Sequence, residues 1–313
     1  METLITQSAT EAAEVIKAGG IVAFPTETVF GLGANIFDES AVGRIYEAKG
    51  RPADNPLIAH ISTWDQIGLL ATEISESAGK FIEAFFPGAL TVVLRKMERV
   101  PTIATAGLDT IGIRMPKLAI ANRFLRLSGV PVVAPSANLS GRPSPTTWEA
   151  VREDMEGRID CILRGDGCEI GLESSVVDCT GDVPVLLRAG SISLEHLRLV
   201  VPETRGFAAD AGDVPRSPGL RHKHYSPLAK VVLVKNGDSI PDSENAAFIG
   251  INNPITGFRS KRICESSDVY ARSIFEFFRE CDRAGIDTIY CEAVGEAGIG
   301  AALMDRLRRA SEN

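Results

Sequence analysis

The sequence contains no long apolar run and no closely paired cysteines. None of its apolar stretches approaches the ~20 residues that span a bilayer, and residues 1–6 show neither the basic nor the apolar region of a secretory signal. Its 6 cysteines never occur as C-x-x-C. We therefore expect reduced core thiols in a cytoplasmic protein without a membrane segment, and the pattern does not favour a structural zinc site.

Positive charge is also in short supply. The chain has 33 Lys and Arg against 41 Asp and Glu, which gives a net charge of −8. Proteins that bind nucleic acid through their overall charge are usually basic, so this class is disfavoured, although a local basic site stays open. With 44% hydrophobic and 24% charged residues, the 313-residue chain has the composition of a globular protein with two domains or one large one.

Three common catalytic signatures are missing, namely the P-loop G-x-x-x-x-G-K-[ST], the zinc-protease H-E-x-x-H and the hydrolase G-x-S-x-G. The run Gly298-Ile299-Gly300 lacks the third glycine of a dinucleotide-binding loop and follows no obvious strand. A nucleotide would therefore be bound by another geometry. The sequence also offers no convincing Ser/His/Asp or Cys/His constellation for nucleophilic catalysis.

Apolar periodicity predicts short strands that alternate with helices through residues 1–201. The expected strands outnumber the crossover helices, which favours a mixed α/β (α+β) twisted sheet over a regular doubly wound one. Residues 202–227 are mostly small, polar and aperiodic, as expected of a linker. A second alternation over residues 228–313 predicts a small domain with a parallel sheet, large enough to fold alone.

Four polar clusters lie where an expected strand or helix ends in a loop, at residues 25–33, 49–57, 108–116 and 134–146. Each has a structural explanation beside the functional one. The first fits a solvated Pro-Gly turn, and the second a helix C-terminus whose cations complement the dipole. The third fits an arginine paired with a structural carboxylate, and the fourth an ordinary β–α loop. For each cluster taken alone, both explanations stay open.

Cations recur in and after these clusters, at Lys49, Arg51, Arg114 and Arg188. Arg51 offers a bidentate fork and Lys49 a point charge, two groups that clamp phosphate. Ser144 and the proline after it form a good N-cap and first position for a helix, whose free N–H groups could hold an anion. In an acidic protein, a few fixed cations on rigid loops suit a small polyanionic ligand better than a long phosphate backbone.

Taken together and in this order, the clusters resemble the YrdC-like family of L-threonylcarbamoyladenylate synthases. The resemblance rests on residues 25–33 (PTETVFGLG), 49–57 (KGRPADNPL) and 135–141 (PSANLSG). Residues 217–227 (SPGLRHKHYSP) are similar to the linker of the long, two-domain form of this family. The segment around Gly298 resembles the final helix of that form's C-terminal domain. Coverage is close to the whole chain.

This resemblance implies both a fold and a reaction. The fold is a twisted YrdC-like sheet with a concave active face, followed by a small Rossmann-like domain. The reaction joins L-threonine, bicarbonate or CO2, and ATP into threonylcarbamoyl-AMP with release of pyrophosphate, which makes the enzyme an adenylyltransferase. The product feeds the threonylcarbamoyladenosine (t6A) modification of tRNA through a separate threonylcarbamoyl transferase complex, and weak contact with tRNA itself stays open. Mg2+ is expected to accompany ATP, held mostly by phosphates and water.

The same resemblance assigns residues to the site. L-Threonine is expected at Thr28, His60, Arg114 and Ser174. The nucleotide is expected at Arg51, Asn55, Thr110, Ala134, Ser136, Ser144, Arg188 and Tyr225. Lys49 and Arg51 are expected to act on phosphate as catalytic cations. The linker, which carries Tyr225, is expected to close over the site as a lid that excludes water.

Three other interpretations compete with this one. A module that binds double-stranded RNA or tRNA would share the concave face, but the net charge of −8 opposes it. A carbamoyl-adenylate enzyme of hydrogenase maturation uses a similar domain, but such proteins carry C-x-x-C zinc fingers, and this sequence has none. A regulatory or ribosome-assembly protein with a vestigial nucleotide site would not be expected to keep Lys49, Arg51 and Asn55.

Overall fold

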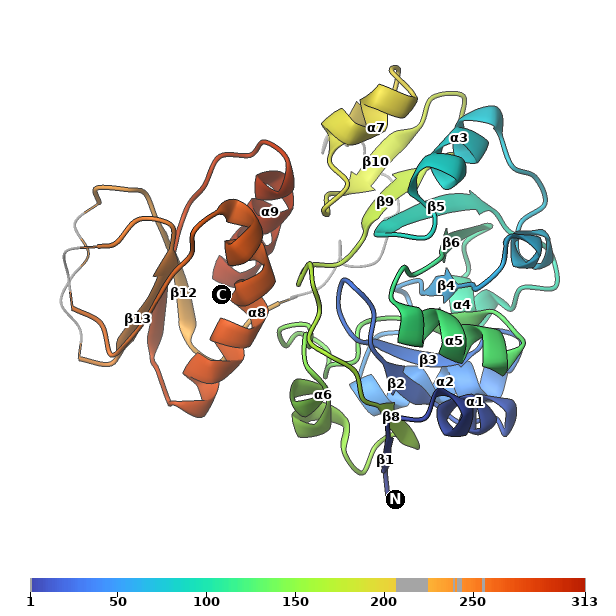
Figure 1. Ribbon diagram of the computed structural model, residues 1–313, viewed down its shortest axis with the longest axis horizontal. Coiled ribbons are helices and arrows are strands. Elements are labelled where there is room, and N and C mark those ends of the chain that lie inside the picture. Colours follow the sequence, from blue (N-terminus) through green and yellow to red (C-terminus); the bar gives the residue numbers. More distant parts are fainter. Residues whose placement is uncertain (1, 207–224, 239, 241–243, 255–256, 313) are drawn as a thin grey trace.

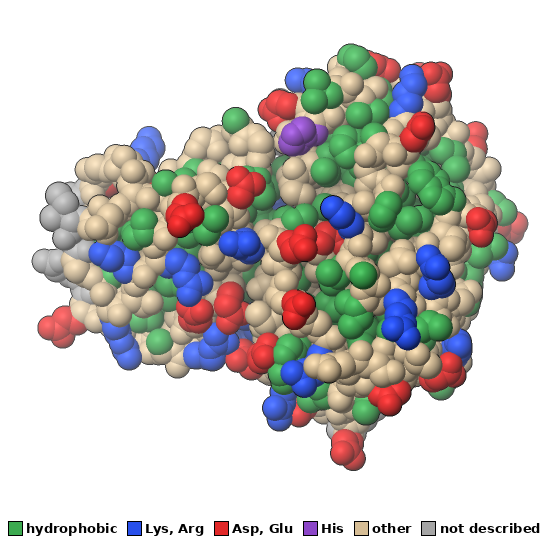
Figure 2. Space-filling model, in the orientation of Figure 1, with side chains coloured by type: hydrophobic (Ala, Val, Ile, Leu, Met, Phe, Trp, Pro, Cys, Tyr) green, Lys and Arg blue, Asp and Glu red, His purple; other side chains and the backbone are tan. Residues whose placement is uncertain are grey.

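The structure is a computed structural model that describes residues 2–206, 225–238, 240, 244–254 and 257–312. It consists of a larger body, formed by the N-terminal two-thirds of the chain, and a smaller C-terminal body beside it (Figure 1). A large mixed sheet is followed by a small parallel one, which confirms the mixed α/β fold class expected from the sequence. Acidic and basic side chains are interspersed over the face of both bodies shown in Figure 2.

The larger body is built on a sheet in the order β1-β8-β2-β3-β7-β4-β6-β5-β9-β10-β11. Its pairing is mixed, since β2 and β3 are antiparallel, β4 and β6 parallel, and β5 and β6 antiparallel. The strands are β1 (Leu4–Thr6), β2 (Val22–Phe24), β3 (Gly31–Asn35), β4 (Ile58–His60), β5 (Leu90–Arg95), β6 (Thr110–Arg114), β7 (Val132–Ala134), β8 (Cys161–Leu163), β9 (Ser175–Asp178), β10 (Val185–Arg188) and β11 (Arg205–Gly206).

Helices cover both faces of this sheet. They are α1 (Ala9–Lys17), α2 (Glu39–Lys49), η1 (a 3-10 helix, Trp64–Leu69), α3 (Glu76–Phe85), α4 (Thr102–Thr105), α5 (Ala119–Ser128), α6 (Trp148–Met155) and α7 (Leu194–Val200). Alternate residues of β2 enter different cores, because successive strand residues point to opposite faces. Phe24 packs in the core that includes residues of α1 and α5, whereas Ala23 packs in the core that includes residues of α2 and α3. With both faces buried, the central strands β2 (VAF) and β7 (VVA) are continuously apolar.

The end of α2 marks where the second polar cluster begins, and the start of α6 marks where the fourth one ends. Asp38 caps α2 by accepting from the Ala41 amide at 3.0 Å, and Gly50 ends the helix in the left-handed conformation, with φ +59°. The segment from Lys49 onward therefore leaves the helix where the sequence predicts. The expected start of α6 at Ser144 is wrong, because Thr147 caps this helix.

The smaller body is a parallel sheet with two helices on one face. Its strands follow the order β12-β15-β13-β14, with β12 (Lys230–Val234), β13 (Ala246–Gly250), β14 (Ser260–Ile263) and β15 (Thr288–Glu292). Helices α8 (Ser267–Arg283) and α9 (Ile299–Ser311) lie on the side that faces the larger body (Figure 1). Strand β14 is not expected from the sequence, because its residues, SKRI, carry no run of apolar side chains.

The two bodies meet through buried side chains. Leu172 of the larger body packs in the core of the smaller one, together with Tyr225 and Phe275. Gly171 has φ +80°, and a Cβ atom there would lie 2.5 Å from the Arg272 Cα of α8. This close backbone approach requires glycine, so the main chains of the two bodies are in direct contact at Gly171.

The expected linker at residues 202–227 is described only at its ends. Residues 207–224 lie outside the described residues, so the predicted lid stays a prediction. At one end, β11 pairs in parallel with β10 and so belongs to the large sheet. At the other end, Tyr225 enters the core of the smaller body.

The cysteines agree with one expectation from the sequence. All six cysteines are buried with free thiols, and burial raises the pKa of Cys161 to about 12. Among the described helices, none combines the length and the apolar character needed to cross a bilayer.

Candidate active site

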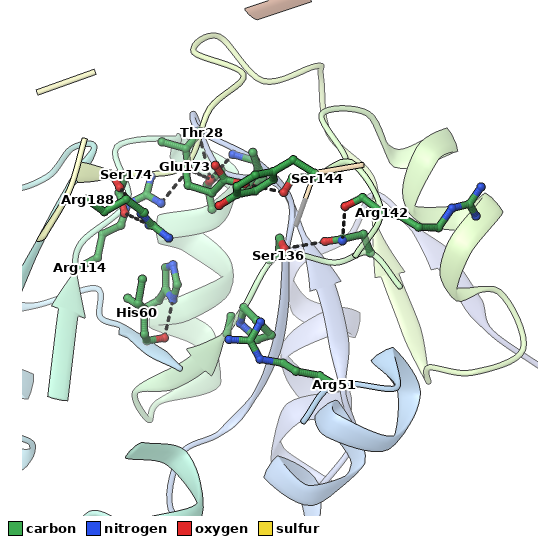
Figure 3. Close-up of a pocket in the computed structure, with 18 residues that line it drawn as sticks. Thr28, Arg51, His60, Arg114, Ser136, Arg142, Ser144, Glu173, Ser174 and Arg188 are labelled. Carbon is green, nitrogen blue, oxygen red and sulfur yellow. Dashed lines mark hydrogen bonds between the residues drawn. The ribbon is translucent and has the colours of Figure 1, made fainter. Parts of the chain in front are cut away.

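A pocket in the larger body brings together residues from all four polar clusters. Its wall includes Thr28, Arg51, Arg114, Ser136 and Ser144. These side chains come from the turn after β2, the end of α2, the end of β6 and the loop after β7. Figure 3 shows them directed at one hollow, together with Arg188 from β10. Tyr225 also lines the pocket.

The register of β4 and β6 places His60 beside Arg114, because these residues are partners at the ends of the two parallel strands. His60 Nδ1 donates to the Ile58 carbonyl at 3.0 Å, and the ring packs edge-on against Phe24. Burial, assisted by the positive charge of Arg114, lowers the pKa of His60 to about 3. The imidazole is therefore neutral near pH 7.

The turn between β2 and β3 is held from inside the protein. The Thr26 hydroxyl accepts from the Thr28 amide at 3.1 Å and donates to the Val29 carbonyl at 2.6 Å. Both threonines are buried, so the alternative of a solvated turn is wrong. Arg114 reaches this turn from β6 and donates to the Thr28 hydroxyl at 2.7 Å and to a Glu27 carboxylate oxygen at 2.6 Å. Arg114 thus has a structural carboxylate partner and also lines the pocket.

Arg51 enters the pocket just beyond the end of α2 and makes few contacts. Its Nη2 donates to the carbonyls of Asn55 and Pro56 over long distances of 3.4 and 3.3 Å. Its Nε is buried and has no hydrogen-bond partner in the part of the chain that is described. Burial is the main cause that lowers the pKa of Arg51 to about 10, so the group is still a cation at pH 7. A cation with an unused buried donor suits an anionic ligand.

Arg188 and Ser174 form a second polar wall. Arg188 donates through Nε to the Ser174 carbonyl at 3.0 Å and through Nη2 to its hydroxyl at 3.2 Å. The same hydroxyl lies 2.8 Å from the Thr91 hydroxyl. Burial lowers the pKa of Arg188. These contacts fix the guanidinium against the segment that leads into β9.

The loop after β7 is tied down by Lys49. This amine donates to the carbonyls of Ser136 and Asn138 at 2.6 and 2.5 Å. Burial, reinforced by the positive charge of Arg51, lowers the pKa of Lys49 well below its usual value. The structure gives Lys49 a role in holding this loop, and its expected action on phosphate stays a prediction.

Ser144 and Glu173 close the pocket on the side of the smaller body. The Ser144 hydroxyl donates to one Glu173 oxygen at 2.5 Å, and Arg306 of α9 donates to the other at 2.9 Å. Burial alone would raise the pKa of Glu173, but the charges of Arg306 and Arg188 outweigh it and the pKa is lowered. Glu173 is therefore an ionised acceptor and no donor.

Comparison with known proteins identifies the family. Residues 14–190 match the family model Sua5_yciO_yrdC, described as Telomere recombination, and residues 192–312 match the one described as Threonylcarbamoyl-AMP synthase, C-terminal domain. The chain is 45% identical to the threonylcarbamoyl-AMP synthase of Pyrococcus abyssi, over 96% of this chain and 93% of that protein. It belongs to the threonylcarbamoyl-AMP synthase family. The synthase of Bacillus subtilis is 38% identical, over 96% and 92% of the two chains.

Solved structures of this family share the arrangement of both bodies. One of them is the structure of P. abyssi Sua5 complexed with L-threonine, whose sequence is 40% identical to this chain. The match covers 99% of this chain and 97% of the Sua5 chain, with a TM-score of 0.89. A variant of the same protein superposes with a TM-score of 0.91. YciO from Escherichia coli, 24% identical with a TM-score of 0.53, covers 60% of this chain and shares the fold alone.

Most of the residues assigned through the family resemblance lie in the pocket wall. They are Thr28, Arg51, His60, Arg114, Ala134, Ser136, Ser144, Ser174, Arg188 and Tyr225. The wall does not include Lys49, Asn55 or Thr110. Asn55 is buried beside Arg51, and its Nδ2 lacks a hydrogen-bond partner among the described residues. Thr110 begins β6, whereas Arg114 ends it, which separates Thr110 from the pocket.

Sequence reasoning missed three charged residues that organise the site. Glu27 was visible only as part of a motif, and nothing local indicates that it pairs with Arg114. Glu173 likewise finds its partners, Ser144 and Arg306, far along the chain. Arg306 did carry a signal, because the helical period places it among the apolar residues that α9 buries. A charged residue at such a position calls for a buried partner.

Proposed function

We propose that this chain joins L-threonine, bicarbonate and ATP into threonylcarbamoyl-AMP in this pocket and releases pyrophosphate. The observation that carries the proposal is the convergence of Arg51, Arg114 and Arg188 on one hollow in a member of this family. ATP and the threonine carbamate that attacks it are both anions, so fixed guanidinium groups serve to hold them together. The complex of P. abyssi Sua5 with L-threonine supports the amino-acid part of the proposal.

The chemistry needs placement more than it needs an acid–base pair. Bicarbonate takes up a proton and loses water to give CO2, and the neutral threonine amine adds to CO2 and releases a proton, which gives a carbamate. A carbamate oxygen then attacks the α-phosphorus of ATP. The bond between the α-phosphorus and the bridging oxygen breaks, and pyrophosphate leaves with that electron pair. Orientation of two bound reactants can supply roughly 7–11 kcal/mol of the barrier, and fixed cations absorb the charge that develops on the leaving group. His60, neutral near pH 7, adds no charge to this step.

L-Threonine is proposed to occupy the end of the pocket near Arg114. The terminal nitrogens of Arg114 carry four N–H groups, and Thr28 and Glu27 each take one. The guanidinium can therefore also face the carboxylate of an amino acid. Its own partners hold it in place before the ligand arrives, which reduces the entropy lost on binding.

The nucleotide is proposed to lie toward Arg51, Ser136 and Ser144. Arg51 has an unpartnered buried Nε within the described structure and makes only long contacts to carbonyls, so phosphate oxygens would give its donors better acceptors. The loop that carries Ser136 is braced by Lys49. The adenylate would thus be held by a braced loop on one side and by a cation on the other.

Mg2+ is proposed to arrive with ATP as part of the substrate. Nowhere in the described residues do three or more His, Cys, Asp or Glu side chains gather to hold a metal ion. The carboxylate in the pocket wall, Glu173, is already engaged by Ser144 and Arg306. Phosphate oxygens and water are the ligands proposed for Mg2+ here.

The product is a mixed anhydride and must be passed on before water destroys it. We propose that a separate threonylcarbamoyl transferase complex consumes it for the t6A modification of tRNA, which places the reaction in the cytoplasm. Direct contact with tRNA is expected to be weak. On the face shown in Figure 2, Lys and Arg side chains are interspersed with Asp and Glu and form no continuous basic surface.

The test is pyrophosphate release from ATP by the purified protein, with L-threonine or bicarbonate omitted in turn. Release that requires both, with threonylcarbamoyl-AMP detected by mass spectrometry, is the expected result. ATP turnover that ignores L-threonine would contradict the proposal. Salt-sensitive binding of RNA without any threonine-dependent turnover would favour the RNA-binding interpretation instead.

A further inference from the structure

A buried arginine from the smaller body reaches the wall of the pocket. Arg306 of α9 is 1% exposed, the largest of the fully buried side chains among the described residues. It donates through Nε to Glu173 at 2.9 Å and through Nη2 to the Ala189 carbonyl at 3.1 Å. Its Nη1 donates to the neighbouring Asp305 at 2.7 Å. The first two contacts cross from the smaller body to the larger one.

One crossing contact ends on a residue of the pocket wall, Glu173, and the other ends beside one. Glu173 accepts from Ser144 through its other oxygen at 2.5 Å, so the carboxylate joins Arg306 to a pocket hydroxyl. Ala189 directly follows Arg188, whose guanidinium lies in the wall. Arg306 is therefore linked to two pocket groups, Ser144 and Arg188, through one intervening residue each, without lining the pocket itself.

Arg306 also packs against the ring of Tyr225. Its Cζ lies 5.3 Å from the centre of the Tyr225 ring, and Phe275 of α8 stacks on this ring at 5.4 Å with an angle of 23°. Tyr225 has φ +65°, a left-handed conformation that is unfavourable for a residue with a side chain. Such a conformation persists only when the surroundings hold it, and here these surroundings include two helices of the smaller body.

We propose that Arg306 is a positioning residue of the nucleotide half of the site, so that the smaller body completes the active site within the same chain. This inference rests on the proposed function and extends it by giving the smaller body a part in binding ATP. The groups that Arg306 positions, Ser144, Arg188 and Tyr225, all belong to the set expected to contact the nucleotide.

The test compares Arg306→Lys with the wild type in the full chain, with pyrophosphate release as the readout. Lysine keeps the charge but lacks the fork that reaches Glu173 and the Ala189 carbonyl together. The KM for ATP should rise about tenfold, the effect of losing one charge-assisted hydrogen bond. The KM for L-threonine should change less, because three of the four residues expected to hold it, Thr28, His60 and Arg114, lie outside the contacts of Arg306; the fourth, Ser174, is bonded to Arg188. Arg283→Ala is the matched control, since Arg283 also bridges the two bodies, through Glu153, but lies outside the pocket wall.

A double variant separates an effect of Arg306 on ATP binding from an effect on folding. Arg306→Met with Glu173→Gln removes both buried charges together, which avoids leaving one unpaired. If Arg306 positions the site, this protein keeps a raised KM for ATP even when its melting temperature is close to that of the wild type. A wild-type KM for ATP in Arg306→Lys or in the double variant would overturn the inference. A wild-type protein with no threonine-dependent turnover would instead overturn the proposed function.

Discussion

Arg114 Nη2 lies 2.6 Å from Glu27 Oε1, and the two side chains are 4% and 5% exposed beneath the pocket. The other Glu27 oxygen accepts from the amides of Lys117 and Leu118 at the start of α5. One carboxylate therefore joins three parts of the larger body, the turn after β2, the end of β6 and the beginning of α5. Because the contacts are buried, the pair depends on both partners.

Glu27→Gln is predicted to destabilise the protein strongly. The substitution keeps the shape of the side chain but leaves the Arg114 guanidinium buried without a counter-charge. We expect the free energy of unfolding to fall by about 3–5 kcal/mol, measured by urea denaturation. Glu14→Gln is the control, because Glu14 forms an exposed pair with Lys17 and should change stability little. Equal effects of the two substitutions would contradict the prediction.

The same carboxylate predicts how stability depends on acid. Burial would raise the pKa of Glu27, but the charge and hydrogen bond of Arg114 outweigh it, so the pKa lies below its usual value of 4.5. The unfolded chain then binds this proton at higher pH than the folded one does. The stabilisation is present above about pH 4.5 and is lost as the pH falls through the lowered pKa. Glu27→Gln should flatten this loss in melting curves recorded between pH 5 and pH 3.

Arg51→Ala is predicted to remove activity while leaving the melting temperature nearly unchanged. Arg51 makes only long hydrogen bonds to carbonyls, so its loss costs the fold little. The phosphates would lose a fixed cation, and threonine-dependent pyrophosphate release should fall about 100-fold. Arg44→Ala is the contrasting control, because Arg44 pairs with Asp160 at 2.8 Å outside the pocket wall. This substitution should lower the melting temperature and leave pyrophosphate release nearly unchanged. A large drop in melting temperature for Arg51→Ala would show that Arg51 is structural.

The sequence predicted the larger elements well because their signals are local. The helix end expected at the start of the 49–57 cluster is the end of α2, and the glycine after it has the left-handed conformation typical of a helix end. The two-domain fold class followed from the change in pattern after residue 228. Strand β14 was missed because its polar sequence carries no apolar periodicity.

Side-chain partners were harder to predict because they depend on contacts across the fold. Ser144 looks like a helix cap in the sequence, but its hydroxyl is taken by Glu173, and Thr147 caps α6 instead. Lys49 looks like a phosphate ligand, but the loop after β7 passes within reach and its carbonyls accept from the amine. In each case the competing partner lies many residues away and leaves no local pattern.

His60 is predicted to stay neutral throughout the physiological range. Burial, followed by the charge of Arg114, lowers its pKa to about 3 from an ordinary 6.5. The ratio of kcat/KM for L-threonine between the wild type and His60→Asn should therefore be constant from pH 6 to pH 8. An ionisation near pH 6.5 that disappears in His60→Asn would contradict this.

The lowered pKa of His60 also destabilises the fold in acid. Below about pH 6.5 the unfolded chain takes up a proton that the folded histidine accepts only near pH 3. Stability is therefore lost as the pH falls through this window. His60→Asn should lose less stability between pH 6.5 and pH 5 than the wild type does, as measured by urea denaturation at each pH.

Lys49→Met is predicted to act through the loop after β7. Methionine keeps most of the apolar stem but gives no donors to the carbonyls of Ser136 and Asn138, which are then left without these hydrogen bonds. We expect the free energy of unfolding to fall by about 1–3 kcal/mol, and the KM for ATP to rise because Ser136 is no longer held. Lys17→Met is the matched control, since Lys17 also ends a helix but is exposed. A loss of kcat with unchanged stability would instead mean that Lys49 acts on phosphate directly.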